Sequence, residues 1–159
     1  MSYIKPIAAK MGSTCLMYQC QPNQPRPLMP RSTSTPVVCI VDDDTDVLGS
    51  LRFLLETDGF DVRTFRSGAA LLNAIAADEV DCLVIDYKMP GMNGLDLAVR
   101  LRKRDIDSPV ILITGYPDQD ISKKAAAAGI RQVVLKPLLE DSLVSRVRDV
   151  IRESHPAFR

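Results

Sequence analysis

The sequence predicts an α/β fold in which helices cover both faces of a five-stranded parallel sheet. Three observations favour this fold. Apolar runs of strand length alternate five times with segments whose apolar residues have helical spacing. Most of the runs are continuous rather than alternating in polarity, which is typical of strands buried on both faces. No two successive runs are joined by a turn of hairpin type, so the connections are predicted to be helical crossovers.

The first predicted strand covers residues 37–41 (VVCIV). The helix that follows is ended by Gly59, and its apolar side consists of Val47, Leu48, Leu51, Leu54 and Leu55. Residues 60–64 alternate between less polar and charged side chains, which predicts a second strand with one wetter face. Ser67 is expected to open the second helix, whose apolar positions are Leu71, Leu72, Ile75 and Ala76.

The second half of the chain repeats this alternation. The third, fourth and fifth strands are predicted over residues 82–85, 110–113 and 132–135. A helix over residues 95–103 separates the third strand from the fourth. A helix ended by Gly129 precedes the fifth strand, and its apolar side consists of Ile121, Ala125 and Ala128. The last helix has an apolar stripe of Leu143, Val144, Val147, Val150 and Ile151.

Composition separates an N-terminal arm from this domain. The chain has 159 residues, with twenty basic and twenty acidic side chains. Residues 1–36 hold four of the basic residues, no acidic residue and six of the eleven prolines. Such a segment buries too little apolar surface to offset the entropy of ordering it, so a disordered basic arm is predicted over residues 1–36. The domain is predicted over residues 37–153, with a short tail over residues 154–159.

Cysteine and histidine content excludes several classes of protein. The four cysteines do not form a close-spaced framework, and Cys39 and Cys82 lie within apolar runs, where they are expected to be small buried side chains. The single histidine, His155, lies four residues from the C-terminus, which disfavours a zinc site and a Ser–His–Asp mechanism. No segment is apolar enough for a membrane span or a secretory signal, so a cytoplasmic protein is expected.

Polar residues stand at the predicted ends of four strands. The first strand is followed by the acidic run of residues 42–44, and the others end in Asp86, Thr114 and Lys136. Ligands of open parallel sheets bind outside the carboxyl ends of the strands. Two carboxylates about 4 Å apart repel by roughly 4 kcal/mol at an effective dielectric constant of ~20, so gathered acids require a cation or a proton. Carboxylate and carbonyl oxygens suit Mg²⁺.

Other interpretations of these acids are weaker. A strand-end aspartate often only caps the next helix, as Asp44 or Thr45 is expected to do here. A calcium loop of EF-hand type fails because Val47 replaces the required glycine and Phe53 the closing glutamate. Neither a dinucleotide fingerprint nor a Walker A loop occurs, because residues 91–94 (GMNG) have the wrong spacing for both.

The whole pattern resembles the response-regulator receiver domains, the phospho-accepting modules of two-component signalling. The resemblance covers about residues 37–153, and five motifs carry it: residues 41–44 (VDDD), 84–94 (VIDYKMPGMNG), 113–115 (ITG), 128–129 (AG) and 135–137 (LKP). It implies a doubly wound, flavodoxin-like sheet of strand order 2-1-3-4-5 with five helices. Residues 114–116 (TGY) make the chain similar to regulators of the nitrogen-fixation type.

The resemblance also implies a role for each matching residue. Asp86 would accept a phosphoryl group from a phosphohistidine, Lys136 would contact the phosphoryl oxygens, and Thr114 would move to hydrogen-bond them. Mg²⁺ would be held by Asp42, Asp43, Asp86 and the backbone carbonyl of Lys88. Pro137 would follow a cis peptide bond. Phosphoryl transfer needs positioning and charge neutralisation above all, which one carboxylate, one metal and one lysine can supply.

The function expected from the resemblance is that of a phosphorelay protein rather than a classical enzyme. Phosphorylation of Asp86 by a sensor histidine kinase or phosphotransfer protein would switch the binding of an output partner, and homodimers could form on phosphorylation. About six residues follow the last helix, so no DNA-binding domain is expected here, and neither nucleic acid nor membrane is an expected partner. The alternatives are a truncated DNA-binding regulator and a receiver-like interaction module that is never phosphorylated. An aspartyl-phosphate phosphatase of the haloacid-dehalogenase kind is disfavoured by Lys88, where that mechanism needs an acid.

Two further features bear on the switch and on nucleic-acid binding. Many receivers have an aromatic residue three positions before the lysine, where this sequence has Val133, and Tyr116 is a candidate substitute. The basic cluster of Arg100, Arg102, Lys103 and Arg104 is expected to complement the dipole at a helix C-terminus rather than to bind nucleic acid.

Overall fold

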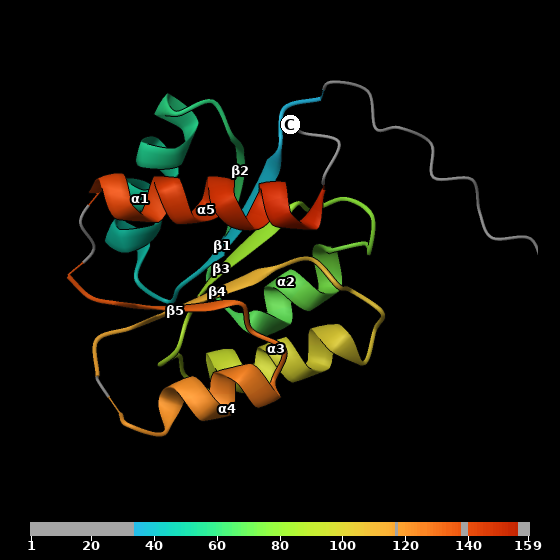
Figure 1. Ribbon diagram of the computed structural model, residues 1–159, viewed down its shortest axis with the longest axis vertical. Helices are drawn as coiled ribbons and strands as arrows, with labels where there is room; N and C mark the ends of the chain where they lie inside the picture. Colours follow the sequence, from blue (N-terminus) through green and yellow to red (C-terminus); the bar gives the residue numbers. More distant parts are fainter. Residues whose placement is uncertain (1–33, 117, 138–139, 156–159) are drawn as a thin grey trace, which may run out of the picture. The chain divides into compact units, whose positions relative to one another are not determined.

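The alternating pattern of strands and helices is confirmed by the computed structural model, which describes residues 34–116, 118–137 and 140–155 (Figure 1). The strands are β1 (Val37–Val41), β2 (Asp61–Phe65), β3 (Cys82–Asp86), β4 (Val110–Thr114) and β5 (Gln132–Leu135). The helices are α1 (Thr45–Thr57), α2 (Gly68–Ala74), α3 (Gly94–Arg102), α4 (Ile121–Ala127) and α5 (Glu140–Ser154). The ten elements alternate strictly, which makes every connection between strands a helical crossover.

The sheet is parallel throughout and has the order β2-β1-β3-β4-β5. Both the strand order and the five helices agree with the fold predicted from the sequence. β1 and β3 are neighbours although a whole strand and two helices separate them in sequence, and Val41 pairs with Ile85 at their carboxyl ends. The residues that follow this pair, Asp42 and Asp86, therefore emerge side by side at one edge of the sheet.

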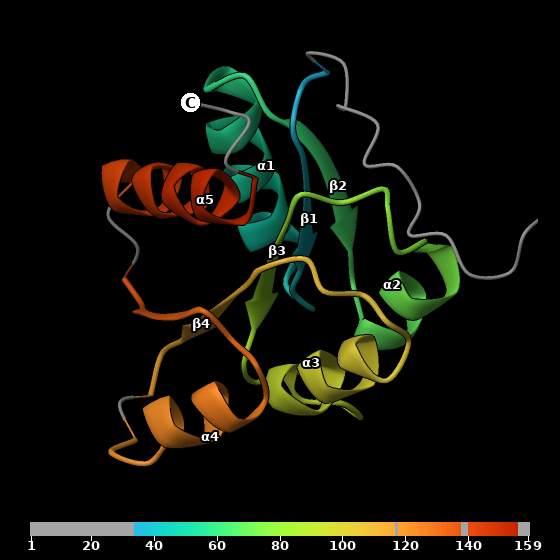
Figure 2. The same ribbon diagram turned by 45° about the vertical axis from the view of Figure 1, so that its right-hand side comes forward.

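Helices cover the sheet in two layers, with α1 and α5 on one face and α2, α3 and α4 on the other (Figures 1 and 2). Alternate residues along each strand face one layer or the other. Ile40 and Val84, for example, pack with Leu55 and Val147 beneath α1 and α5. Cys39, in the core beneath α2, α3 and α4, and Cys82, in the core beneath α1 and α5, are buried free thiols, as expected from the apolar runs that contain them.

Most predicted helix boundaries agree with the structure. Asp44 caps α1 by accepting hydrogen bonds from the backbone N–H groups of Asp46 and Val47, and Ser67 caps α2. Gly129 ends the α4 segment with a φ of 73°, a conformation that glycine adopts without steric cost. The second helix is shorter than predicted, because Ile75 is extended and Ala76 lies beyond the helix. Ile75 still packs against the core, so its apolar side chain is used without helical geometry.

A buried carboxylate lies at the amino ends of the strands, opposite the predicted site. Asp81 accepts a hydrogen bond from the backbone N–H of Val37 at 2.8 Å, and its own N–H donates to the Val37 carbonyl. Nε2 of His155, just after α5, lies 3.6 Å from the other carboxylate oxygen of Asp81. Asp81 thus ties together the starts of β1 and β3 and the end of α5.

The predicted arm over residues 1–36 falls mainly on residues 1–33, and four residues of the predicted tail are residues 156–159; both stretches lie outside the described residues. The carbonyl of Pro36 is described, and it accepts a hydrogen bond from the N–H of Asp61 on β2. Among the described residues, no helix has the length and apolar character needed to cross a membrane.

Candidate functional site

Three carboxylates converge at the carboxyl ends of β1 and β3. Asp42, Asp43 and Asp86 each offer one carboxylate oxygen, and these oxygens all lie within 4.8 Å of one another. Asp42 and Asp86 are buried, with 4% and 7% of their surface exposed, whereas Asp43 is open to solvent. The sheet order causes this convergence, because β1 and β3 are adjacent and end at the same level.

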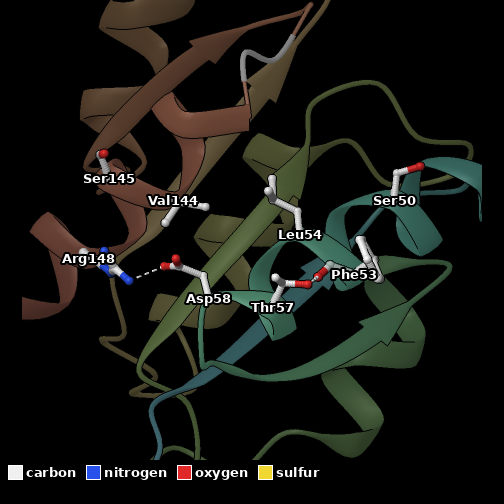
Figure 3. Close-up of a pocket in the computed structure, with 8 residues that line it drawn as sticks. All are labelled: Ser50, Phe53, Leu54, Thr57, Asp58, Val144, Ser145 and Arg148. Atoms are coloured by element: carbon white, nitrogen blue, oxygen red, sulfur yellow. Dashed lines mark hydrogen bonds and ion pairs between the residues drawn. The ribbon is translucent and has the colours of Figure 1, made fainter.

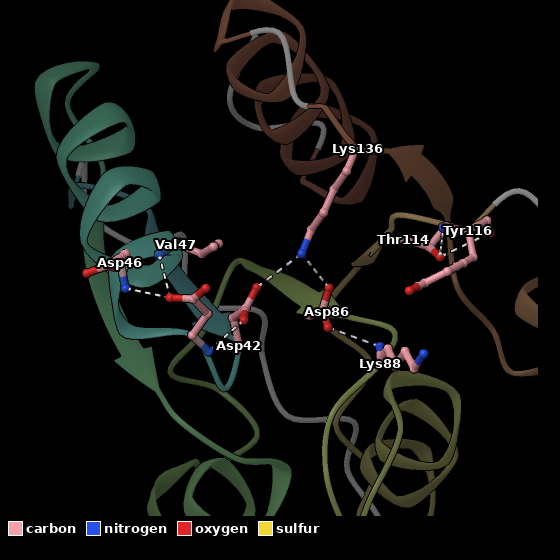
Figure 4. A network of polar contacts seen from close by, with 9 residues as sticks. Asp42, Asp46, Val47, Asp86, Lys88, Thr114, Tyr116 and Lys136 are labelled. Atoms are coloured by element: carbon pink, nitrogen blue, oxygen red, sulfur yellow. Dashed lines mark hydrogen bonds and ion pairs between the residues drawn. The ribbon is translucent and has the colours of Figure 1, made fainter.

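Lys136 supplies the nearest cation to the two buried acids. Its ammonium group lies 2.9 Å from Oδ1 of Asp86 and 3.6 Å from Oδ2 of Asp42 (Figure 4). It follows β5 directly, and its backbone N–H donates to the carbonyl of Thr114 at 2.8 Å. The peptide bond between Lys136 and Pro137 is cis, as the resemblance implied.

Backbone groups hold the remaining carboxylate oxygens in place. Oδ1 of Asp42 accepts a hydrogen bond from the N–H of Asp44 at 2.9 Å, and Oδ2 of Asp86 accepts one from the N–H of Lys88 at 3.0 Å. The Asp86 carboxylate is therefore held between an ammonium group on one oxygen and a backbone N–H on the other. Both contacts fix the orientation of its side chain.

Thr114 ends β4 close to these residues, and only 1% of its surface is exposed. Its hydroxyl donates a hydrogen bond to the carbonyl of Tyr116 at 3.2 Å and accepts one from the N–H of Tyr116 at 3.1 Å. Tyr116 itself is 61% exposed, in the loop after β4. The single proton of the Thr114 hydroxyl is therefore donated to the backbone of this loop.

The charges in the site shift two pKa values. Burial raises the pKa of Asp42 above its ordinary value of 3.8; the hydrogen bond from Asp44 opposes this rise and the neighbouring Asp86 adds to it. Burial lowers the pKa of Lys136, but the hydrogen bond to Asp86 and the charges of Asp86 and Asp42 together raise it above its ordinary value. Lys136 therefore stays protonated across the physiological pH range.

Comparison with known proteins identifies the arrangement. The family model described as "Response regulator receiver domain" matches residues 38–148, which is more than half of the chain. The chain belongs to the response regulator receiver domain family. Residues 38–148 include all six of the predicted site residues.

Two curated relatives are named as regulators. The transcriptional regulatory protein FixJ of Bradyrhizobium diazoefficiens is 32% identical over 122 residues, which cover 77% of this chain and 60% of FixJ. The response regulator protein TodT of Pseudomonas putida is 33% identical over 135 residues, covering 85% of this chain and 58% of TodT. This receiver chain therefore spans about three fifths of the length of either relative.

Solved structures show the same fold. A CheY-like receiver domain protein from Methanospirillum hungatei superposes with a TM-score of 0.73 at 27% identity, over 78% of this chain and 99% of that one. This receiver thus shares its fold with a solved CheY-like receiver domain protein.

The donor set of the receiver's acidic site suits a hard divalent cation. All three side-chain donors are carboxylate oxygens, two of them buried, and a cluster of this kind repels itself unless a cation is present. Among the described residues, Lys136 forms ion pairs with Asp42 and Asp86, and its single positive charge leaves the three carboxylates with a negative balance. The site therefore fits Mg²⁺, which prefers a few carboxylates and retained water.

Two side chains have roles that sequence reasoning missed: Lys88 beside the site, and Arg102 near the loops that precede β4 and β5. The ammonium group of Lys88 lies over the ring of Tyr116, 4.5 Å from its centroid.

Arg102 lies in the cluster predicted to complement a helix dipole, but its guanidinium donates hydrogen bonds to the carbonyls of Ile106, Ser108 and Gly129. Arg102 therefore has a structural role of a different kind from the one predicted. No signal within the helix itself indicates these partners.

Two further regions lie outside the acidic site. Val133 on β5 is half-buried and packs against the core beneath α2, α3 and α4. A groove between α1 and α5 is lined by Ser50, Phe53, Leu54, Thr57, Asp58, Val144, Ser145 and Arg148 (Figure 3). It contains none of the acids described above, and its polar end is closed by the ion pair of Arg148 with Asp58.

Proposed function

We propose that this receiver takes a phosphoryl group onto Asp86 from a phosphohistidine, in a reaction that requires Mg²⁺. The observation that carries the proposal is the environment of Asp86. It is a buried carboxylate with a lysine ammonium 2.9 Å away and two further carboxylates beside it. Such a site holds a nucleophile, a cation for the transferred oxygens and ligands for a metal within one small volume.

The chain's own residues supply most of what the transfer requires. A carboxylate oxygen of Asp86 forms a bond to phosphorus as the bond between phosphorus and the imidazole nitrogen of the donor breaks. The nitrogen keeps the electron pair of that bond, and the histidine leaves as neutral imidazole because the other ring nitrogen of the phosphohistidine already carries a proton. Lys136 stabilises negative charge on the phosphoryl oxygens, because its ammonium group already lies beside Asp86. The N–H of Lys88 holds the carboxylate in one orientation.

The metal would be held by Asp42, Asp43, Asp86 and the backbone carbonyl of Lys88. When bound, Mg²⁺ supplies positive charge that offsets the charge of the carboxylates and of the incoming phosphoryl group. Thr114 would then turn its hydroxyl toward the phosphoryl oxygens.

The donor would be a sensor histidine kinase or a phosphotransfer protein, and the product would change the binding of an output partner or of a second copy of the chain. Because FixJ is named as a transcriptional regulatory protein, a role in transcription is one candidate output. A receiver-like module that never takes up phosphate is the alternative.

Uptake from a small phosphodonor tests the proposal directly. The protein is incubated with acetyl phosphate, with Mg²⁺ or with EDTA, and intact mass spectrometry measures the gain of one phosphoryl group. We expect the gain only with Mg²⁺ and only when Asp86 is present. Asp86→Asn, which keeps the shape of the side chain, should abolish it. The matched control is Asp120→Asn at an exposed acid that makes no capping hydrogen bond. Undiminished labelling of folded Asp86→Asn protein would contradict the assignment, and failure of the wild type to label would favour the alternative.

A further inference from the structure

Lys88 and Tyr116 join two loops across the edge of the site. Lys88 belongs to the loop after β3, and Tyr116 belongs to the loop after β4. The Lys88 ammonium lies 4.5 Å from the centroid of the Tyr116 ring, within the range of a cation–π interaction. Both residues are exposed, so neither is held in place by burial in the core.

Each partner is also tied to a residue of the proposed phosphorylation site. The N–H of Lys88 donates to Oδ2 of Asp86, and the N–H and carbonyl of Tyr116 both bond to the hydroxyl of Thr114 (Figure 4). The contacts therefore form a continuous chain from Asp86 through Lys88 and Tyr116 to Thr114.

We propose that the contact between Lys88 and Tyr116 is a latch that holds the loop after β4 in its resting conformation and opens on phosphorylation. The proposal rests on the proposed function, because it takes Asp86 as the phosphoryl acceptor. On phosphorylation the ammonium group of Lys88 leaves the Tyr116 ring and contacts the phosphoryl oxygens on Asp86, so the ring is released.

Two contacts of the resting loop involve groups that a phosphoryl group on Asp86 would also bind: the hydroxyl of Thr114 and the ammonium group of Lys88. The hydroxyl of Thr114 has one proton, which it donates to the Tyr116 carbonyl. A phosphoryl oxygen is an acceptor, so it can receive that proton only if the carbonyl gives it up. A phosphoryl group on Asp86 also places new negative charge near Lys88, and an ammonium–phosphate contact is stronger than an exposed cation–π contact. Both changes detach the loop from the site.

In the proposed latch Tyr116 supplies the aromatic ring of the switch, because β5 has Val133 at the position where many receivers have an aromatic residue. Val133 is half-buried in the core and its χ1 is restricted by β-branching, so it cannot swing between two positions. Tyr116 is already exposed and is held by contacts that the reaction itself would remove. In this proposal the position of the Tyr116 ring on the surface therefore depends on whether Asp86 is phosphorylated.

The resting contact can be measured without any phosphorylation. A lysine that lies over a tyrosine ring has side-chain proton signals shifted upfield by the ring current. We expect this shift for Lys88 in the wild type, its loss in Tyr116→Leu, and its retention in Tyr116→Phe, which keeps a ring beneath the ammonium group. Addition of Mg²⁺ and beryllofluoride, a tetrahedral mimic of a carboxylate-bound phosphoryl group, should remove the shift in the wild type.

Affinity for beryllofluoride then measures the coupling. The latch opposes the bound state, so Tyr116→Leu should tighten binding about two- to fivefold, which is the range expected for an exposed cation–π contact. In a Lys88→Met background, Tyr116→Leu should have no further effect. A tightening of equal size in both backgrounds would overturn the latch, since Tyr116 would then act without Lys88.

The outcomes separate the latch from the function on which it rests. Binding of beryllofluoride to the wild type with an unchanged Lys88 shift would overturn the latch alone. Absence of any binding to the wild type, with the shift present in the resting protein, would overturn the proposed function and the opening step together. Absence of the resting shift would overturn the latch whatever the ligand does.

Discussion

The ammonium group of Lys136 lies 2.9 Å from the carboxylate of Asp86, although the two residues are fifty positions apart in sequence. The sheet brings them together, because β3 and β5 both end at the edge where β4 lies between them. The same ammonium group lies 3.6 Å from Asp42, so one cation is shared by two buried acids. In the resting protein the Lys136 ammonium group therefore supplies part of the positive charge that a bound metal would supply.

Lys136→Met should separate metal binding from phosphoryl uptake. The variant removes the cation from two buried carboxylates, so we expect it to lower the free energy of unfolding by about 1–3 kcal/mol in EDTA. Mg²⁺ should bind more tightly than in the wild type, since no ammonium group competes with it, and should restore part of the stability. Uptake from acetyl phosphate should fall. Urea unfolding with and without Mg²⁺ checks these expectations, and weaker Mg²⁺ binding in the variant would contradict them.

Asp42→Asn should stabilise the metal-free protein at neutral pH. Burial raises the pKa of Asp42 in the folded state, so the folded protein holds this proton more tightly than the unfolded chain does. Ionising Asp42 therefore costs stability, and this cost grows as the pH rises from below 3.8 through the folded pKa. Asparagine cannot ionise. Urea midpoints in EDTA should be higher for the variant at neutral pH and should converge with the wild type in acid, whereas a constant difference at all pH values would argue against the effect of ionisation.

Thr114→Ala should loosen the loop after β4 while leaving the acceptor in place. The variant removes the hydroxyl that bonds to both the N–H and the carbonyl of Tyr116, at a cost of about 1 kcal/mol. Amide exchange at Tyr116 should become faster, and uptake from acetyl phosphate should be largely retained. Thr114→Ser keeps the hydroxyl and is the matched control. Equal acceleration of exchange in the serine variant would show that the lost methyl group, rather than the hydrogen bonds, is responsible.

Arg102→Ala should destabilise the fold without affecting phosphoryl uptake. Its guanidinium binds three backbone carbonyls at the end of α3 and at Gly129, so we expect a loss of about 2–3 kcal/mol in urea unfolding. Arg100→Ala, at an exposed position on the same helix, should change stability by no more than about 0.5 kcal/mol. Similar small effects for both variants would show that the carbonyl contacts contribute little.

The alternation of elements could be predicted because it follows from local patterns: continuous apolar runs indicate buried parallel strands, whose carboxyl ends lie at one edge of the sheet. That Asp42, Asp86 and Lys136 meet there depends on the strand order, which the resemblance to receiver domains implied and no local pattern did. The end of α2 could not be predicted in this way. Ile75 has helical spacing with Leu71 and Leu72, and its burial satisfies the pattern equally well in the extended conformation that it adopts.

Contacts that depend on side-chain direction between distant segments were also beyond the sequence. Asp81 looks like an ordinary polar residue before a strand, but its partner Val37 lies 44 positions away. Neither helical nor strand periodicity places the Lys88 ammonium over Tyr116, because both residues belong to loops. Arg102 was expected to have a structural role, but its partners are carbonyls of two separate loops rather than a helix dipole.

The contact of His155 with Asp81 places the end of α5 at the opposite edge of the sheet from Asp86. Strands of five residues at about 3.3 Å each make that separation roughly 17 Å. A small molecule bound at His155 is therefore too far away for direct contact with a phosphoryl group on Asp86. Phosphorylation could change binding at His155 only through a conformational change in the strands or in α5. A molecule bound beside Tyr116 would instead be close enough to contact the phosphorylated site directly.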